Sequence, residues 1–211
     1  METIHRGHSS AEVIEQIFKD MPPAPEVLDL TWGNGTFWKW EYEAVNLLLV
    51  TNDLHTGSDL HRDFTDMEMD DRLYTTVVFD PPFTAQGPNK KAEERHNDRY
   101  GATRDLNGAP QNIHDVHRLL RGGIKEACRI ARDYVIVKTQ DVVESGKLHG
   151  SVNLAMNEIV ANNFNIIETI RFFPQRRPQP NGRRVTGLGG QPSVFIVAET
   201  ATPRGGCATS N

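Results

Sequence analysis

The most constraining feature of the chain is a tetrapeptide of one acid, two prolines and one aromatic residue, which are Asp80, Pro81, Pro82 and Phe83. It directly follows the apolar run 76–79 (Thr-Val-Val-Phe), which is typical of a buried strand. A strand cannot continue through the two prolines, because neither has an N–H and each fixes φ at about −65°. We therefore expect the carboxylate and the ring at the C-terminal end of a strand, the edge at which open parallel sheets bind ligands.

A second motif lies upstream, where residues 27–36 read Val-Leu-Asp-Leu-Thr-Trp-Gly-Asn-Gly-Thr. Its apolar start predicts a strand, and Gly33 and Gly35 stand where this strand would turn into a helix. Glycines at such a turn adopt unusual backbone angles and let a ligand approach closely. A tight turn packed against the helix is the alternative explanation, and the third glycine of a dinucleotide fingerprint is missing.

Hydrophobic periodicity predicts alternating strands and helices along the rest of the chain. The expected helices are 10–20, 36–43, 113–130 and 151–162, and the expected strands are 26–30, 45–51, 74–79, 134–138, 165–173 and 193–198. This alternation implies an α/β protein with a doubly wound sheet. Residues 84–111 show no sustained periodicity, so we expect a long loop that is either disordered or functional, for example as a lid.

Length and composition predict one domain over residues 1–199 and a disordered tail over 200–211. No apolar run reaches the roughly 18 residues of a membrane span, and no signal-peptide core follows Met1. We therefore expect a cytoplasmic protein without a membrane partner. We expect no metal site, because the two cysteines form no ligand pattern and His114 and His117 lack a third ligand.

The net charge of −5 argues against a protein that coats nucleic acid nonspecifically. The charges are segregated, however. Residues 53–71 hold seven acids and one arginine, whereas the interval between Glu168 and Glu199 holds no acid and five arginines: Arg171, Arg176, Arg177, Arg183 and Arg184. This arginine-rich interval predicts a surface that contacts a polyanion, and a solvated hairpin is the alternative.

Together, the glycine loop and the Asp-Pro-Pro-Phe motif resemble those of class I S-adenosylmethionine-dependent methyltransferases, specifically the amino-methyltransferases of nucleic-acid bases. The resemblance runs from about residue 10 to 199. Residues 137–141 and 193–197 carry a narrower likeness to small DNA-modification methyltransferases of phages and actinobacteria. The resemblance implies S-adenosyl-L-methionine as cofactor and a Rossmann-like fold, with helices on both faces of a mostly parallel seven-stranded sheet that ends in an antiparallel hairpin.

The resemblance also assigns roles to residues of the cofactor site. The loop that would wrap the methionine part of the cofactor comprises Asp29, Leu30, Thr31, Gly33, Gly35 and Thr36, with Asp29 near the ammonium group. Asp53 would accept hydrogen bonds from ribose hydroxyls, and Asn52 is a competing candidate. Asp63 and Phe64 would hold the adenine ring, although an acidic solvated loop would also explain them.

The Asp-Pro-Pro-Phe motif suits the methylation of an exocyclic amine, whose lone pair is delocalised into the base. Acceptors that draw its hydrogens out of plane would localise this lone pair, and the Asp80 carboxylate and the Pro81 carbonyl can do so together. Phe83 can stack on the extracted base. Contacts to substrate are further expected from Lys138, Arg176, Arg177, Arg183 and Arg184.

The sequence therefore predicts methyl transfer to an exocyclic amine of a nucleic-acid base, with adenine N6 in DNA preferred over RNA as the substrate. The motif is equally compatible with cytosine N4. The alternatives are a ribosomal RNA N2-guanine methyltransferase or another RNA methyltransferase, and a noncatalytic member of the fold that binds nucleic acid. The sequence predicts neither the oligomeric state nor the recognition sequence.

Overall fold

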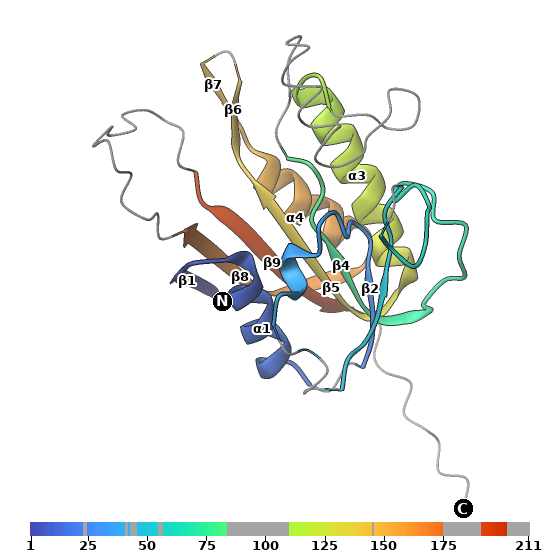
Figure 1. Ribbon diagram of the computed structural model, residues 1–211. Helices are drawn as coiled ribbons and strands as arrows, with labels where there is room; N and C mark the ends of the chain where they lie inside the picture. Colours follow the sequence, from blue (N-terminus) through green and yellow to red (C-terminus); the bar gives the residue numbers. More distant parts are fainter. Residues whose placement is uncertain are drawn as a thin grey trace, which may run out of the picture.

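The computed structural model describes residues 1–22, 25–40, 42, 46–54, 57–83, 110–144, 146–174 and 191–201. A seven-stranded sheet in the order β1-β8-β9-β5-β4-β2-β3 runs through this part of the chain (Figure 1). Only β9 is antiparallel to its neighbours in this sheet. The strands are Glu2–Gly7 (β1), Glu26–Asp29 (β2), Leu48–Thr51 (β3), Tyr74–Phe79 (β4), Ala131–Gln140 (β5), Phe164–Pro174 (β8) and Ser193–Thr200 (β9).

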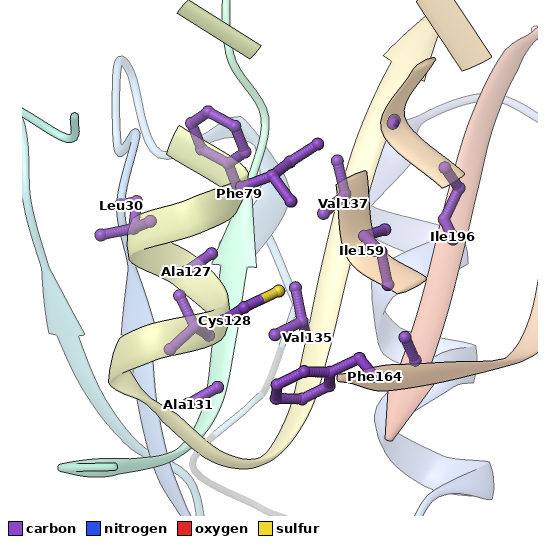
Figure 2. Packing of buried hydrophobic residues seen from close by; sticks show 14 of the residues in the cluster. Leu30, Phe79, Ala127, Cys128, Ala131, Val135, Val137, Ile159, Phe164 and Ile196 are labelled. Atoms are coloured by element: carbon purple, nitrogen blue, oxygen red, sulfur yellow. The ribbon is translucent and has the colours of Figure 1, made fainter. Parts of the chain in front are cut away.

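Helices cover both faces of the sheet. On one face lie helix α1 (Ser10–Asp20) and the short 3-10 helix η1 (Thr36–Trp38). Side chains from these two elements pack on Val78, Ile136 and other apolar residues of the strands. On the other face lie α3 (Ile113–Ile130) and α4 (Ser151–Ala161), which enclose the second apolar cluster (Figures 1 and 2). This architecture confirms the predicted Rossmann-like fold, with a mostly parallel seven-stranded sheet and an antiparallel hairpin of β8 and β9.

The strand that precedes the tetrapeptide is held in the core by α3. Phe79, the last residue of β4, is fully buried against this helix, as Figure 2 shows. A Cβ atom added to Gly123 of α3 would overlap the Phe79 ring. This glycine therefore makes room for the side chain that sits next to Asp80.

We predict that Gly123→Ala destabilises the protein by about 1–3 kcal/mol, because overpacking forces a core ring to move. The loss should occur although alanine is the better helix former by about 0.5–1 kcal/mol. Gly122→Ala is the control with the milder contact, since its Cβ atom would lie 2.9 Å from Thr65 Cγ2 and 3.1 Å from Thr65 Cβ, whereas the Cβ atom at position 123 would overlap the Phe79 ring itself. Its free energy of unfolding should stay within about 1 kcal/mol of the wild-type value. Denaturant unfolding of both variants measures this, and equal stabilities would contradict the prediction.

One predicted helix is wrong. Residues 36–43 were expected to form a helix, but after the single 3-10 turn of η1 the described residues 39, 40 and 42 are not part of an α-helix. The physical reason is aromatic packing: Phe18 of α1 lies against Trp38 and Trp40, with ring centroids 5.7 and 6.3 Å apart. Packing of these rings stabilises the non-helical conformation more than continued helical hydrogen bonding would stabilise a helix.

Three strands were not predicted. Strand β1 pairs with β8 in parallel at the sheet edge, and its residues are polar enough that the local sequence gives no strand signal. A second antiparallel pair, β6 (Val142–Glu144) and β7 (Lys147–His149), follows β5 directly. A Glu144 carboxylate oxygen accepts a hydrogen bond from the Ile113 N–H at 3.0 Å, which ties this hairpin to the start of α3.

Candidate active site

Three charged side chains meet at the C-terminal edge of neighbouring parallel strands. Asp29 ends β2, Asp80 directly follows β4, and Lys138 lies near the end of β5. Each comes two residues after an apolar side chain of the cluster beneath α1, these being Val27, Val78 and Ile136. Because successive side chains of a strand alternate between faces, all three charged groups project to the α1 face of the sheet.

Asp29 is buried, with 2% of its surface exposed. Its Oδ1 accepts a hydrogen bond from the Thr31 N–H at 2.9 Å, and its Oδ2 accepts one from the Trp38 indole at 2.7 Å. Burial raises the pKa of Asp29 to about 7, the two hydrogen bonds oppose this rise, and the carboxylates of Asp80 and Asp53 add to it. The Trp38 contact was not predicted, and no sequence signal distinguishes this tryptophan from its neighbours.

The glycine loop adopts the conformation for which its glycines are suited. Gly33 and Gly35 both have positive φ, +55° and +63°. The Gly33 N–H donates to Asp53 Oδ2 at 2.9 Å, so Asp53 lies against the loop. The Leu30 side chain is fully buried in the core, its N–H donates to the Val78 carbonyl, and its carbonyl accepts from the Asn52 side chain, so Leu30 supports the loop from below. Thr36 opens η1 and is exposed.

Asn52 is excluded as the ribose ligand by its contacts. It is fully buried, its side-chain amide donates to the carbonyls of Leu30 and Arg62, and its Oδ1 accepts from the Arg62 N–H. The Asn52 side chain thus joins the glycine loop, at Leu30, to the acid-rich residues 53–71, at Arg62. Asp53 remains the candidate.

The predicted adenine-binding pair is partly engaged in other contacts. Asp63 Oδ1 accepts hydrogen bonds from the backbone N–H and the hydroxyl of Thr65, both at 2.8 Å, which stabilises its own turn. Phe64 is half-buried and packs on Phe79, with ring centroids 5.3 Å apart. Both residues therefore shape the loop beside β4, and their role toward a cofactor stays a prediction.

The tetrapeptide is connected to the glycine loop by a hydrogen bond. The Asp80 N–H donates to Thr31 Oγ1 at 2.8 Å. Pro81 is buried, whereas Pro82 and Phe83 are half-buried. Asp80 Oδ2 accepts from Lys138 Nζ at 3.0 Å, while its Oδ1 is buried without a hydrogen-bond partner among the described residues. Burial raises the pKa of Asp80, and the Lys138 ammonium opposes this rise.

Lys138 is enclosed, with 9% of its surface exposed. Its Nζ lies 5.0, 5.3 and 6.0 Å from the ring centroids of Phe37, Phe83 and Phe195, within reach of cation–π attraction. The rings of Phe37 and Phe195 were not predicted as part of the site. Their spacing in the sequence is that of ordinary core residues, and only the fold places them around a lysine.

Part of the predicted substrate surface lies outside the described residues, namely Arg176, Arg177, Arg183 and Arg184, together with most of the 84–111 segment. Arg171, at the edge of the same interval, pairs with Glu2 of β1. Across the described ranges, no group of three or more metal-binding side chains is present. In the same ranges, no helix has both the length and the hydropathy needed to cross a membrane.

No protein-family model and no curated protein sequence matches the chain. Solved structures do resemble it over most of their length. Magnesium protoporphyrin IX methyltransferase from Synechocystis PCC 6803 with bound SAH has a TM-score of 0.52 and 12% identity, over 90% of this chain and 81% of that one. Geranyl diphosphate methyltransferase in complex with GPP and sinefungin has a TM-score of 0.55 and 10% identity, over 90% and 77%.

A third solved structure, of a candidate S-adenosylmethionine-dependent methyltransferase from Listeria monocytogenes, has a TM-score of 0.50 and 14% identity, over 90% of this chain and 97% of that one. At such low identity these likenesses concern the fold. The chain thus has the Rossmann-like fold of the class I methyltransferases, as the two sequence motifs predicted.

Proposed function

We propose that the protein is an S-adenosylmethionine-dependent methyltransferase that modifies an exocyclic amine of a nucleic-acid base, with adenine N6 in DNA as the preferred target. The observation that carries this proposal is the hydrogen bond between the Asp80 N–H and Thr31 Oγ1 at 2.8 Å. It fixes the acid of the tetrapeptide next to the glycine loop, so that a group held by the loop and an amine held by Asp80 would lie side by side.

The residues of the loop fit a cationic cofactor. Asp29, Asp53 and Asp80 are close enough that the last two raise the pKa of the first, and a ligand that carries positive charge would relieve this repulsion. S-adenosylmethionine carries an ammonium group and, when bound, supplies a methyl group on a positively charged sulfur. Solved structures that resemble the chain bind SAH, SAM or sinefungin, which supports the same choice. Asp29 and the backbone of residues 31–36 would hold the ammonium end.

Asp80 would act on the amine. Its carboxylate would accept a hydrogen bond from an N–H of the base, which localises the nitrogen lone pair, and would then take the proton that the amine loses on methylation. Burial raises the pKa of Asp80, and the charge and hydrogen bond of Lys138 oppose this rise and so favour the carboxylate form that accepts from the amine. Phe83 would stack on the base, because it follows Asp80 closely and its ring faces the same ammonium.

Methyl-labelled S-adenosylmethionine tests this proposal. We expect transfer of label to DNA, recovered as a methylated nucleoside after digestion, and weaker transfer to RNA of the same sequence. Transfer to RNA or protein alone would overturn the DNA assignment. No binding of the cofactor in calorimetry would favour the noncatalytic alternative. Mapping the labelled base identifies the target amine.

We predict that cofactor affinity tightens as the pH rises from 6 to 8. Asp29 has a pKa of about 7, and a cationic ligand favours its carboxylate form, so binding below that pH releases a proton. One released proton changes affinity by at most about tenfold per pH unit. Calorimetry in buffers of different ionisation enthalpy measures both the affinity and the proton release.

Asp29→Asn should bind the cofactor more weakly at pH 8 and lose most of this pH dependence. Asp70→Asn, a change at an exposed acid, is the matched control and should behave as wild type. The same pKa shift predicts how the stability of the cofactor-free protein depends on pH. Because the pKa of Asp29 rises on folding, protonation of this group stabilises the folded state. This contribution to the free energy of unfolding is complete below about pH 4 and is lost as the pH rises to 7. A pH dependence unchanged in Asp29→Asn would contradict this assignment.

A further inference from the structure

The Asp80–Lys138 pair presents a hydrogen-bond acceptor and a donor side by side. Asp80 Oδ2 and Lys138 Nζ are 3.0 Å apart. Because Asp80 Oδ1 is buried, the 22% of the Asp80 side chain that is exposed leaves Oδ2 as the oxygen offered to a substrate. The ammonium has three donor hydrogens, of which Asp80 takes one. Both atoms therefore keep capacity for a ligand at the same place.

The rings around Lys138 fix the direction in which this pair can act. Phe37 and Phe195 lie near the ammonium on the α1 face of the sheet, and Phe83 lies near it within the tetrapeptide. A base that stacks on Phe83 with its amine on Asp80 is thereby brought next to Lys138. If Lys138 Nζ turned toward solvent, it would lose both its ion pair with Asp80 and its contacts with the three rings.

We propose that Lys138, acting with Asp80, reads the amidine edge of the target base, so that the exocyclic amine donates to Asp80 while the neighbouring ring nitrogen accepts from Lys138. This inference rests on the proposed function and deepens it. The same acceptor–donor pattern, supplied by one amide side chain, is how asparagine and glutamine read adenine in duplex DNA.

The pattern selects among the bases. Adenine N6 is flanked by the acceptors N1 and N7, and cytosine N4 is flanked by the acceptor N3. Guanine N2 is flanked on its open side by the N1–H group. This group is a donor, so it could not accept a hydrogen bond from the Lys138 ammonium. The acceptor on the other side of N2 is guanine N3, which lies beside the sugar. Lys138 is therefore a specificity-determining residue that favours adenine and cytosine and disfavours guanine N2.

Deaza analogues test the contact in the intact wild-type chain. The mapped target base is replaced in an oligonucleotide by 1-deazaadenine or 7-deazaadenine, or by 3-deazacytosine if the target is cytosine. We expect the analogue that lacks the nitrogen facing Lys138 to be methylated about 10- to 100-fold more slowly, as for a lost hydrogen bond to a charged group. The altered ring delocalises the amine lone pair less, so intrinsic reactivity would change the rate in the opposite direction.

A second measurement separates this contact from the support that Lys138 gives to Asp80. Lys138→Met should lower the rate on the natural base and abolish the difference between that base and the slow analogue. The inference would be overturned if the wild-type enzyme methylated all analogues at the rate of the natural base, or if guanine were the methylated base. Either outcome would still be compatible with methyl transfer to a nucleic-acid base. Absence of transfer to any nucleic acid would instead overturn the proposed function, and the inference with it.

Discussion

Replacement of Asp80 by alanine should lower the rate of methyl transfer by about 10²- to 10⁴-fold, the range in which a positioned acid or base contributes to catalysis. The variant loses the acceptor that would draw the amine hydrogens out of plane, and it loses the carboxylate that pairs with Lys138 at 3.0 Å. The Asp80 N–H bond to Thr31 does not involve the side chain and should survive. We therefore expect cofactor affinity to change far less than the rate, which single-turnover kinetics and calorimetry can separate.

Two control variants test whether the loss of rate is specific to the Asp80 carboxylate. Asp70→Ala removes one exposed carboxylate and should leave the rate unchanged. The double variant Asp80→Ala, Lys138→Met removes the ammonium that the single change would leave unpaired among aromatic rings. It should recover stability lost in the single variant and remain inactive. An Asp80→Ala enzyme with wild-type rate would refute the role of the tetrapeptide.

Gly35→Ala should destabilise the protein by about 2–5 kcal/mol and weaken cofactor binding by about tenfold or more. Gly35 has φ +63°, a conformation that costs a residue with a Cβ atom about 1–2 kcal/mol. In addition, the new Cβ would lie 2.6 Å from Trp32 Cζ2, so the indole must move, at a cost of about 1–3 kcal/mol. Moving the indole disturbs the loop whose backbone would hold the cofactor.

Gly146→Ala is the matched control for Gly35→Ala. Gly146 also has positive φ, +78°, but apart from its two chain neighbours no atom of the described residues lies within 4 Å of the position of its Cβ. This variant carries the backbone cost alone, so denaturant unfolding should show a smaller loss of stability than for Gly35→Ala. Cofactor affinity, measured by calorimetry, should stay at the wild-type value. Equal effects of the two substitutions on stability would mean that the contact with Trp32 contributes nothing.

Much of the fold is readable from local pattern. Helix α3 was expected over 113–130 because its apolar residues recur at helical spacing, and the structure gives the same bounds. Strand β4 was expected over 74–79, since the prolines that follow must end it, and it ends at Phe79. Strand β1 was not readable, because a short polar strand at a sheet edge gains its hydrogen bonds from β8, far away in sequence.

The site divides in the same way. The sequence by itself determined that Asp80 and Phe83 stand at the end of a strand, because proline chemistry acts locally, and that Gly33 and Gly35 mark a turn. Only the tertiary structure decided that Lys138 faces Asp80, because their contact depends on the register of β4 against β5 across 58 residues of chain. The aromatic surroundings of Lys138 likewise come from η1 and β9, which only packing across the sheet brings together.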